Sequence, residues 1–221
     1  MSKNYPIEGN VYHVFNKSIA GYKIFNDITE FSRILNTIRY YQIENPRTKF
    51  SKFTKTNSDD SRRIKELLPE SDQGRLVKIV AYCIMPTHVH LILNQLQDDG
   101  ISIFTSNVFN SYTRYFNIKY NRKGPLWEGR SKRVLVESDE QLIHLTRYVH
   151  LNPVTAYLVN IPEQWHTSSY NEYLSNIEKE EDKICEFDEL LDIDPISYKE
   201  FVDDQISYQR ELKSIKDLCL E

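Results

Sequence analysis

Two histidines separated by one residue lie in a mostly apolar stretch of the chain. His88 and His90 occupy the middle of residues 84–93. Successive side chains of a β-strand point to opposite faces, so these two imidazoles project from the same side and can reach one divalent ion. The spacing therefore predicts a metal site on a strand, although an H-x-H pair taken alone is more often structural.

A second segment supplies further groups for such a site. Residues 145–153 are predicted to form the end of a helix. Tyr148 and Asn152 are four residues apart there and share a face, as does His144 one turn earlier. If this face lies over the histidine strand, Asn152 joins the two imidazoles in a neutral three-ligand site. Imidazole and amide ligands suit Mn²⁺, and they suit Mg²⁺ where phosphate and water oxygens complete the shell.

Tyr148 is the candidate nucleophile. A phenol is a poor nucleophile at neutral pH, so it needs a base, a nearby cation or an activated phosphate. A bound ion would polarise the scissile phosphate while Tyr148 attacks phosphorus in line and the 3′-oxygen leaves. The resulting 5′-phosphotyrosine conserves the energy of the phosphodiester, so a second 3′-hydroxyl can reverse the step. This chemistry is strand transfer, and the chain has no Gly-rich phosphate loop for a nucleotide cofactor.

Residues 112–133 combine positive charge with aromatic rings. Phosphates bind basic side chains and exposed bases stack on aromatic rings, so this composition suits a nucleic-acid strand. An amphipathic helix with solvated basic residues and core aromatics fits the composition equally well. The candidate DNA contacts are Arg114, Lys119, Arg122, Lys123, Trp127, Arg130, Lys132 and Arg133.

The overall composition predicts a soluble protein of the cytoplasm. Hydrophobic residues make up 40% and charged residues 27% of the 221 residues, and no apolar run approaches the roughly 18 residues of a membrane span. The amino terminus lacks the basic-then-apolar layout of a secretory signal. Three cysteines show neither pairing nor metal-clip spacing, which favours free thiols in a reducing compartment.

The net charge of −4 conceals an asymmetry between the two ends of the chain. Residues 176–221 hold 15 Asp and Glu but only 6 Lys and Arg, so residues 1–175 are net positive. We predict one domain over 1–175, with a polar surface insertion at about 44–74. An acidic tail follows over 176–221, helical around 197–218 and loosely attached. A tail folded back on the basic face is the alternative to a solvated helical appendage.

The periodicity of apolar residues predicts the elements that must position these groups. Asn152-Pro153 is expected to end the last helix, because proline disfavours helical geometry in the residue before it. The order predicts an α+β, ferredoxin-like antiparallel sheet with helices on one face, plus a catalytic helix and a C-terminal helical extension. The expected elements are a strand at 11–15, a helix at 28–43, strands at 76–84 and 88–94, a helix at 101–121, a strand at 133–137 and a helix at 139–151.

Several spaced motifs, taken in order, resemble those of the single-tyrosine HUH transposases, the IS200-like family. They are the histidine motif at 86–93, the segment GPLWEGRSK at 124–132 and the segment RYVHLNPV at 147–154. With residues 12–17 the resemblance covers about 10–170. The chain looks most like the REP-associated tyrosine transposase branch, because it has the W-E-G-R segment and has Asn152 where the insertion-sequence branch usually has glutamine.

The resemblance implies roles for the residues already singled out. His88, His90 and Asn152 would be metal ligands for Mg²⁺ or Mn²⁺, and Tyr148 the nucleophile. Members of the family nick and rejoin single-stranded DNA beside small hairpins, so single-stranded or hairpin DNA is the expected partner and a membrane is not. In some relatives the tyrosine helix serves the partner's site, so a homodimer and a monomer both stay open.

Two other functions compete with this one. A non-catalytic nucleic-acid-binding module of the same fold would keep the two histidines in its core. A metal-dependent hydrolase would cut with water and form no covalent intermediate. The remaining histidines are interpreted as structural or, for His144 and His150, as capping or solvating their helix.

Overall fold

Four strands form one antiparallel sheet in the computed structural model, which describes residues 8–54, 60–177 and 182–218. Their order is β2-β3-β1-β4, so β1 and β3 are the inner strands. The strand that carries His88 and His90 is therefore an inner strand. The strands are β1 Val11–Lys17, β2 Val77–Met85, β3 His88–Gln95 and β4 Lys132–Leu135.

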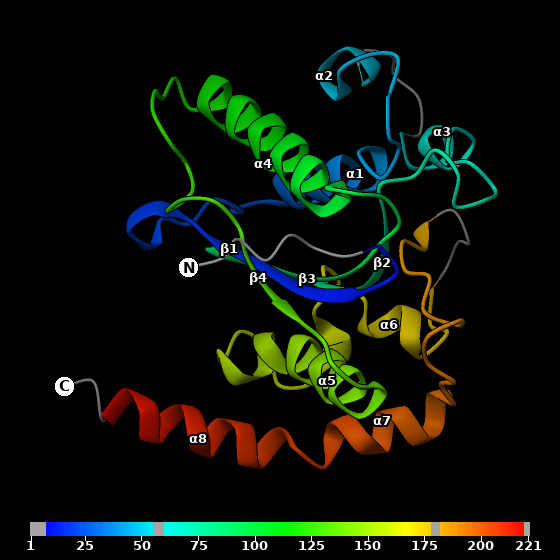
Figure 1. Cartoon of the computed structure of the whole chain (residues 1–221). Coiled ribbons are helices and arrows are strands. Elements are labelled where there is room, and N and C mark those ends of the chain that lie inside the picture. Colours follow the sequence, from blue (N-terminus) through cyan, green and yellow to red (C-terminus); the bar gives the residue numbers. More distant parts are fainter. Residues whose placement is uncertain (1–7, 55–59, 178–181, 219–221) are drawn as a thin grey trace, which may run out of the picture.

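Two long helices cover one face of the sheet. α1 Ile28–Tyr40, which follows the short helix η1 Ile19–Gly21, packs against α4 Gly100–Lys119, and both lie above the strands in Figure 1. Asp27 caps α1 by accepting a hydrogen bond from the Glu30 backbone N–H at 3.0 Å, which satisfies a donor of the first turn. The elements follow the predicted order and confirm the ferredoxin-like α+β fold.

The segment 44–74 contributes to the core, although its composition predicts a surface insertion. It contains α2 Phe50–Phe53 and α3 Asp60–Lys65, and α3 packs on α1. The side chains of Phe50 and Ile64 are fully buried. The prediction is wrong on this point because two apolar side chains are enough to dock a segment that is polar on average.

The helix that follows β4 lies on the opposite face of the sheet. α5 Asp139–Thr155 packs against β2 and β3 and lies below them in Figure 1. Its first turn has a capping box. The Ser138 hydroxyl accepts from the Gln141 backbone N–H at 3.1 Å, and the Gln141 side chain accepts from the Glu137 N–H at 2.6 Å. These bonds define the start of the helix.

α5 is longer at its C-terminal end than the sequence predicts. Asn152 before Pro153 is an expected helix end, yet the helix continues to Thr155, and the Ala156 N–H donates to the Asn152 carbonyl at 2.9 Å. Pro153 is buried, and we attribute the extra turn to this packing, which opposes the preference that proline imposes on its predecessor. Asn152 therefore stays on the helix, one turn after Tyr148.

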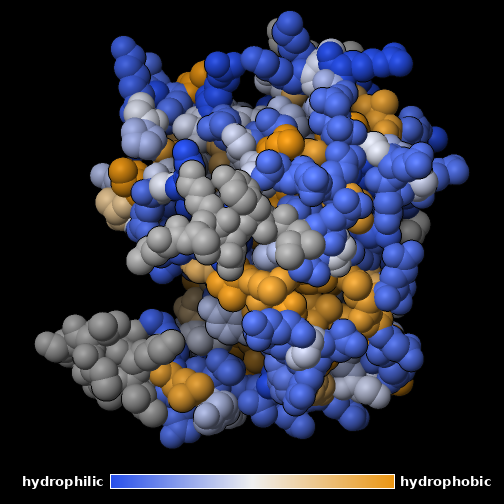
Figure 2. Space-filling view, in the orientation of Figure 1, coloured by the Kyte–Doolittle hydropathy of each residue, from blue (hydrophilic) through white to orange (hydrophobic). Residues whose placement is uncertain are grey.

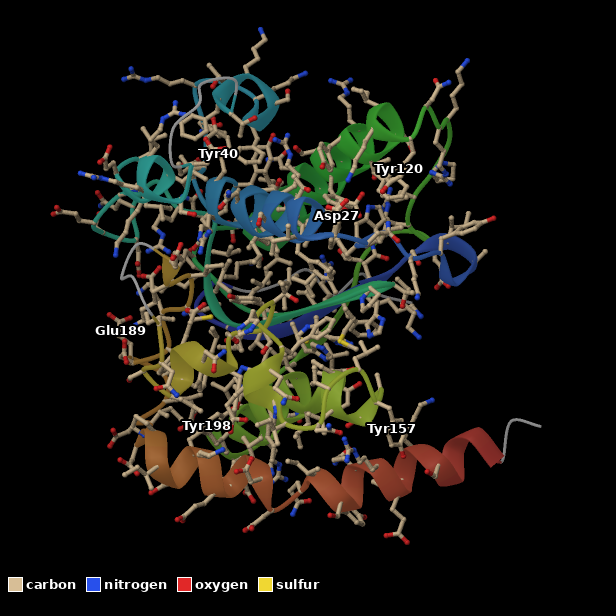
Figure 3. The ribbon with its side chains drawn as sticks, turned by 180° about the vertical axis from the view of Figure 1, so that it is seen from behind. Asp27, Tyr40, Tyr120, Tyr157, Glu189 and Tyr198 are labelled. Carbon is tan, nitrogen blue, oxygen red and sulfur yellow. The ribbon has the colours of Figure 1, made fainter. Side chains whose placement is uncertain are left out.

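The C-terminal tail is folded against α5. After the short helices η2 Pro162–Gln164 and α6 Tyr170–Tyr173, the helices α7 Pro195–Asp203 and α8 Ile206–Leu218 run beneath α5 in Figure 1. Figure 3 shows Tyr198 on α7 beneath the α5 layer. The helical prediction is confirmed.

The expectation of a loosely attached, solvated tail is wrong. Ile184, Cys185, Tyr198 and Val202 are all buried, so the tail supplies apolar side chains to the core. Just after α5, the Tyr157 ring packs against the Arg210 guanidinium of α8, which lies 5.3 Å from the ring centroid. Composition alone does not separate these buried apolar side chains from the acidic residues of the tail.

The outer surface shown in Figure 2 is mainly hydrophilic. Hydrophobic residues gather there in a band between the upper half of the molecule, with α1 to α4, and the lower half, with α5 to α8. No helix in the part of the chain that the structure describes is long and apolar enough to cross a membrane.

Candidate active site

Strand pairing places one row of side chains across three strands of the sheet. His90 on β3 pairs with Phe15 on β1, and Phe15 pairs with Lys132 on β4. Directly paired residues of an antiparallel sheet point to the same face, so all three project toward α5. His88, two residues from His90, pairs with Lys17 in the next row. Both imidazoles therefore lie on the α5 side, with two lysines in their rows.

Tyr148 on α5 lies beside these histidines of its own chain. Its ring meets His90 edge-on, with the centroids 5.8 Å apart, and the centroid of His13 is 6.3 Å away. The side chain is 44% exposed. Among the described residues its hydroxyl has no hydrogen-bond partner. The phenol is thus both next to the imidazoles and accessible to a substrate.

Asn152 completes the group that the sequence spacing singles out. Its side chain lies near the His88 ring and partly offsets the lowering of the His88 pKa, and its amide nitrogen donates to the Tyr148 carbonyl at 3.4 Å. The structure thus places His88, His90, Tyr148 and Asn152 next to one another. Helix α5 presents the phenol and the amide one turn apart, facing the strand that carries the imidazoles.

Both histidines of the pair are neutral at pH 7. Burial is the main cause, and it lowers the pKa of His88 to about 4 and that of His90 to about 2. The neighbouring rings of His88 and His13 add to the effect at His90, and the charge of Lys17 lowers the pKa of both. Neutral imidazole is the form that binds a metal ion.

A third imidazole, that of His13, belongs to the same cluster, although the sequence pattern indicates only a structural role for it. His13 Nε2 lies 2.9 Å from His90 Nδ1, and the two rings are nearly parallel with centroids 5.2 Å apart. Burial lowers the pKa of His13 to about 4. Alternation along the first strand places His13 on the face of Phe15, but only the register against β3 brings it to His90.

His144 and His150 on α5 point away from this cluster. His144 is exposed and lies 2.8 Å from the Arg147 guanidinium. Each step of four residues turns a helix by about 40° beyond a full circle, so two steps carry His144 far from the face of Asn152. The prediction that His144 shares the helix face of Tyr148 and Asn152 is wrong. His150 is fully buried and not a solvating residue.

Three of the predicted DNA contacts have roles inside the protein. Trp127 is buried, and its ring nitrogen donates to the Phe109 carbonyl at 3.3 Å, so the expectation that it stacks on a base is corrected. Lys119 donates to the carboxylates of Asp27 and Glu30 at 2.8 Å each. Arg122 donates to the Asn117 side chain at 3.0 Å and to the Pro125 carbonyl at 2.7 Å.

The other five candidates are exposed, and β4 presents two of them on opposite faces. Lys132 points toward α5, whereas Arg133 points to the other face and donates to the Ser102 hydroxyl at 3.0 Å. On that face a groove of about 1050 Å³ lies between the first half of α4 and residues 127–133, and Arg130 also lines it. The exposed candidates are Arg114, Lys123, Arg130, Lys132 and Arg133.

The donor atoms of the cluster fit a divalent ion only if the amide takes part. Within the described residues, no group of three or more His, Cys, Asp or Glu side chains is arranged to hold a metal ion. His88 Nδ1 lies 3.0 Å from the Thr87 hydroxyl and His90 Nδ1 meets His13. These contacts leave Nε2 of each ring, together with the Asn152 amide oxygen, as the natural donor set.

Comparison with known proteins shows which proteins the chain is similar to. The family model described as "Transposase IS200 like" matches residues 45–152, a range that contains both histidines, Tyr148 and Asn152. A protein of Haemophilus influenzae named as a REP-associated tyrosine transposase is 28% identical over 102 residues, which are 42% of this chain and 58% of that relative. The chain thus spans little more than half the length of this curated relative.

A solved structure agrees with the fold. It is described as a REP-associated tyrosine transposase bound to a REP hairpin, with a TM-score of 0.52 and 16% identity, covering 88% of this chain and 98% of that one. At this identity the likeness concerns the fold alone. The family match and the curated relative confirm the predicted resemblance to the IS200-like transposases and, within them, to the REP-associated tyrosine transposases, and the solved structure agrees with it in fold.

Proposed function

We propose that the protein is a metal-dependent DNA transposase that nicks and rejoins single-stranded DNA near hairpins through a 5′-phosphotyrosine. The observation that carries this proposal is the exposed Tyr148 phenol beside the neutral imidazoles of His88 and His90 in one chain. The relatives named above, one of them bound to a REP hairpin, support DNA as the substrate.

In the proposed reaction, the Tyr148 oxygen attacks a backbone phosphorus and its proton passes to solvent. The bond from phosphorus to the 3′-oxygen breaks, and the leaving oxygen takes up a proton from solvent. The 5′ end of the DNA is then held as a phosphotyrosine ester. Attack by a second 3′-hydroxyl on this ester releases Tyr148 and joins the strands, so no external energy source is required.

His88, His90 and Asn152 are the proposed ligands for Mg²⁺ or Mn²⁺. The ion would polarise the scissile phosphate and offset the charge that develops in the transition state. Because all three ligands are neutral, they leave the ion its full positive charge. Asn152 follows Tyr148 by one turn of α5, and its amide nitrogen donates to the Tyr148 carbonyl, so α5 positions nucleophile and amide together.

The exposed basic residues suggest how the DNA strand is held. We propose that Arg130 and Arg133 bind phosphates in the groove along α4, and that Lys132 binds a phosphate on the α5 side of the sheet. Lys132 lies in the row of His90, two strands away, which corresponds to about 10 Å. Arg114 and Lys123 remain candidate contacts at greater distance along the surface.

A covalent adduct tests the proposed reaction. Labelled single-stranded hairpin DNA with Mn²⁺ should form an adduct with the wild-type protein and none with Tyr148→Phe, while hairpin affinity stays unchanged. Tyr157→Phe is the matched control, because Tyr157 is an exposed tyrosine just after the end of α5 that contacts α8 instead of the histidines. Cleavage by Tyr148→Phe would indicate the water-using hydrolase, and binding without cleavage by the wild type would indicate the non-catalytic module.

Charge reversal tests the proposed DNA contacts. Lys132→Glu and Arg130→Glu should weaken hairpin binding and reduce the slope of log K against log salt by about 0.7 to 0.9 for each lost phosphate contact. Lys52→Glu, an exposed residue of α2 remote from β4, should leave the slope unchanged. Equal slopes in all variants would refute this footprint.

Mixing two inactive variants tests whether one chain forms the whole site. All four proposed groups meet within a single chain, so Tyr148→Phe and His90→Ala should stay inactive when mixed. Recovery of the adduct in the mixture would show that Tyr148 of one copy serves the histidines of another, as a homodimer with exchanged helices requires.

A further inference from the structure

We infer that His13 is a positioning residue of the active site: it holds the His90 ring in the orientation and tautomer that leave Nε2 for the metal ion. The inference rests on the proposed function, because it assigns a role toward the same ion. It adds His13, which lies 75 positions before His88 in the chain and outside the histidine motif at 86–93.

The geometry of the two rings carries the inference. His13 Nε2 and His90 Nδ1 are 2.9 Å apart, a normal hydrogen-bond distance, and the rings are tilted by only 18°. His13 pairs with Ile92 on β3, so it is a diagonal neighbour of His90 across the two inner strands. The Phe15 ring packs on both imidazoles, with centroid distances of 5.1 Å to His13 and 6.0 Å to His90.

The position of one proton defines what this contact does. A hydrogen bond between two ring nitrogens contains a single proton, and an imidazole that binds a metal ion through Nε2 keeps its proton on Nδ1 and donates it to an outer partner. His90 Nδ1–H would therefore donate to His13 Nε2. His13 then carries its own proton on Nδ1, and its Nε2 is occupied by His90 rather than by the ion.

His88 shows the same arrangement with a different partner. The Thr87 hydroxyl lies 3.0 Å from His88 Nδ1, so in both rings the protein engages Nδ1. Two imidazoles held through the same ring atom both present Nε2. This parallel distinguishes an oriented pair from two core histidines that happen to touch.

Metal binding by full-length variants tests the inference without relying on activity. Titration with Mn²⁺, followed by electron paramagnetic resonance, should show affinity about 10- to 100-fold weaker in His13→Leu, the usual effect of removing an outer partner. His13→Gln should retain most of the affinity, because its amide oxygen can accept the His90 Nδ1 proton. His144→Leu, an exposed histidine of α5, is the control and should bind as the wild type does.

Nitrogen NMR of labelled histidines gives a second readout in the metal-free protein. The wild type and His13→Gln should show His90 protonated at Nδ1, and His13→Leu should lose this preference. Thermal unfolding without metal checks that each variant is folded. If His13→Leu does not fold, the His90 tautomer in the wild type and in His13→Gln decides the question.

Three results would overturn the inference. Wild-type Mn²⁺ affinity in a folded His13→Leu would mean that the contact has no effect on the site. Equal losses in His13→Leu and His13→Gln would mean that the imidazole is itself a ligand. A wild-type His90 protonated at Nε2 would mean the opposite tautomer. Failure of the wild-type protein to bind Mn²⁺ would instead contradict the proposed function itself, and the two failures are distinguishable.

Discussion

His90 and His150 are both buried histidines, yet their surroundings differ. Burial lowers the pKa of His90 to about 2 and that of His150 to about 3. Both nitrogens of His150 have partners, the Tyr198 hydroxyl and the Ser169 hydroxyl, each at 2.7 Å. His90 has His13 at Nδ1, while its other side faces the exposed Tyr148. Burial and a lowered pKa therefore do not identify a functional histidine, whereas an incompletely engaged ring beside an accessible nucleophile does.

Helix α5 separates these two environments. Tyr148 and Asn152 face the imidazoles of the sheet, and His150 between them faces the rings of Tyr173 on α6 and Tyr198 on α7 in the tail, with centroids 4.8 and 5.8 Å away. The tail thus fixes the helix from one side while the other side meets the site. The comparison predicts that the two histidines affect different measurements.

The largest expected effect is the loss of adduct in His90→Ala. Because His90 is a proposed ligand and not a DNA contact, we expect adduct formation to fall by at least about 100-fold, with hairpin affinity almost unchanged. EDTA should act on the wild type in the same way. Gel-resolved adduct and fluorescence anisotropy provide the two measurements. A parallel loss of DNA binding would mean that His90 contacts DNA or supports the fold.

His150→Ala should reverse this pattern. Removing a fully buried ring from a packed cluster leaves a cavity, and the free energy of unfolding should fall by about 3 kcal/mol. Urea unfolding measures the change, and the protein that remains folded without urea should still form the adduct, because marginal proteins tolerate a loss of this size while largely folded. If stability is unchanged but the adduct is lost, His150 takes part in the reaction and the comparison fails.

Acid should destabilise the protein through its buried histidines. Their folded pKa values, about 4 for His13 and His88, about 2 for His90 and about 3 for His150, lie below the unfolded value near 6.5. The unfolded chain therefore binds more protons below pH 6.5. The stabilising contribution is complete above that pH and decreases toward pH 4, by about 1.4 kcal/mol per pH unit for each ring.

The His150→Gln variant isolates one of these rings. Between pH 6 and 4.5 its unfolding free energy, measured in EDTA, should depend on pH less steeply than that of the wild type, by about one proton. Equal slopes would show that His150 is protonated in the folded protein, contrary to its closed surroundings.

The smallest expected effect belongs to His144→Ala. His144 is exposed on the outer side of α5, against Arg147 and with its ring 5.4 Å from that of Phe201. We expect a change in stability below about 0.5 kcal/mol and no change in adduct formation. A clear loss of adduct with intact stability would extend the active face of α5 to this residue.

The sequence predicts the main elements of this fold and the two pairs of proposed site residues, because both depend on regular periods. His88 and His90 share a strand face at a spacing of two, and Tyr148 and Asn152 share a helix face at a spacing of four. These two pairings need no knowledge of packing. That the helix face lies over the histidine strand of the same chain follows only from the structure, in which the Tyr148 ring lies beside that of His90.

The remaining features depend on contacts that no local period records. His13 reaches His90 only through the register of β1 against β3. Trp127 and Lys119 look like DNA contacts by residue type. Trp127 instead packs in an aromatic core, and Lys119 binds the carboxylates of Asp27 and Glu30. The tail looks solvated by average charge, yet Tyr198 and its apolar neighbours dock it. In each case tertiary structure selects among several uses of the same residue.

The most direct measurement of the central claim is identification of the residue that carries the DNA. After reaction with hairpin DNA and Mn²⁺, nuclease trimming and proteolysis, mass spectrometry should find a nucleotide phosphate on the peptide that contains Tyr148 and on no other tyrosine peptide. Attachment to another tyrosine, or cleaved DNA with every tyrosine unmodified, would contradict the account.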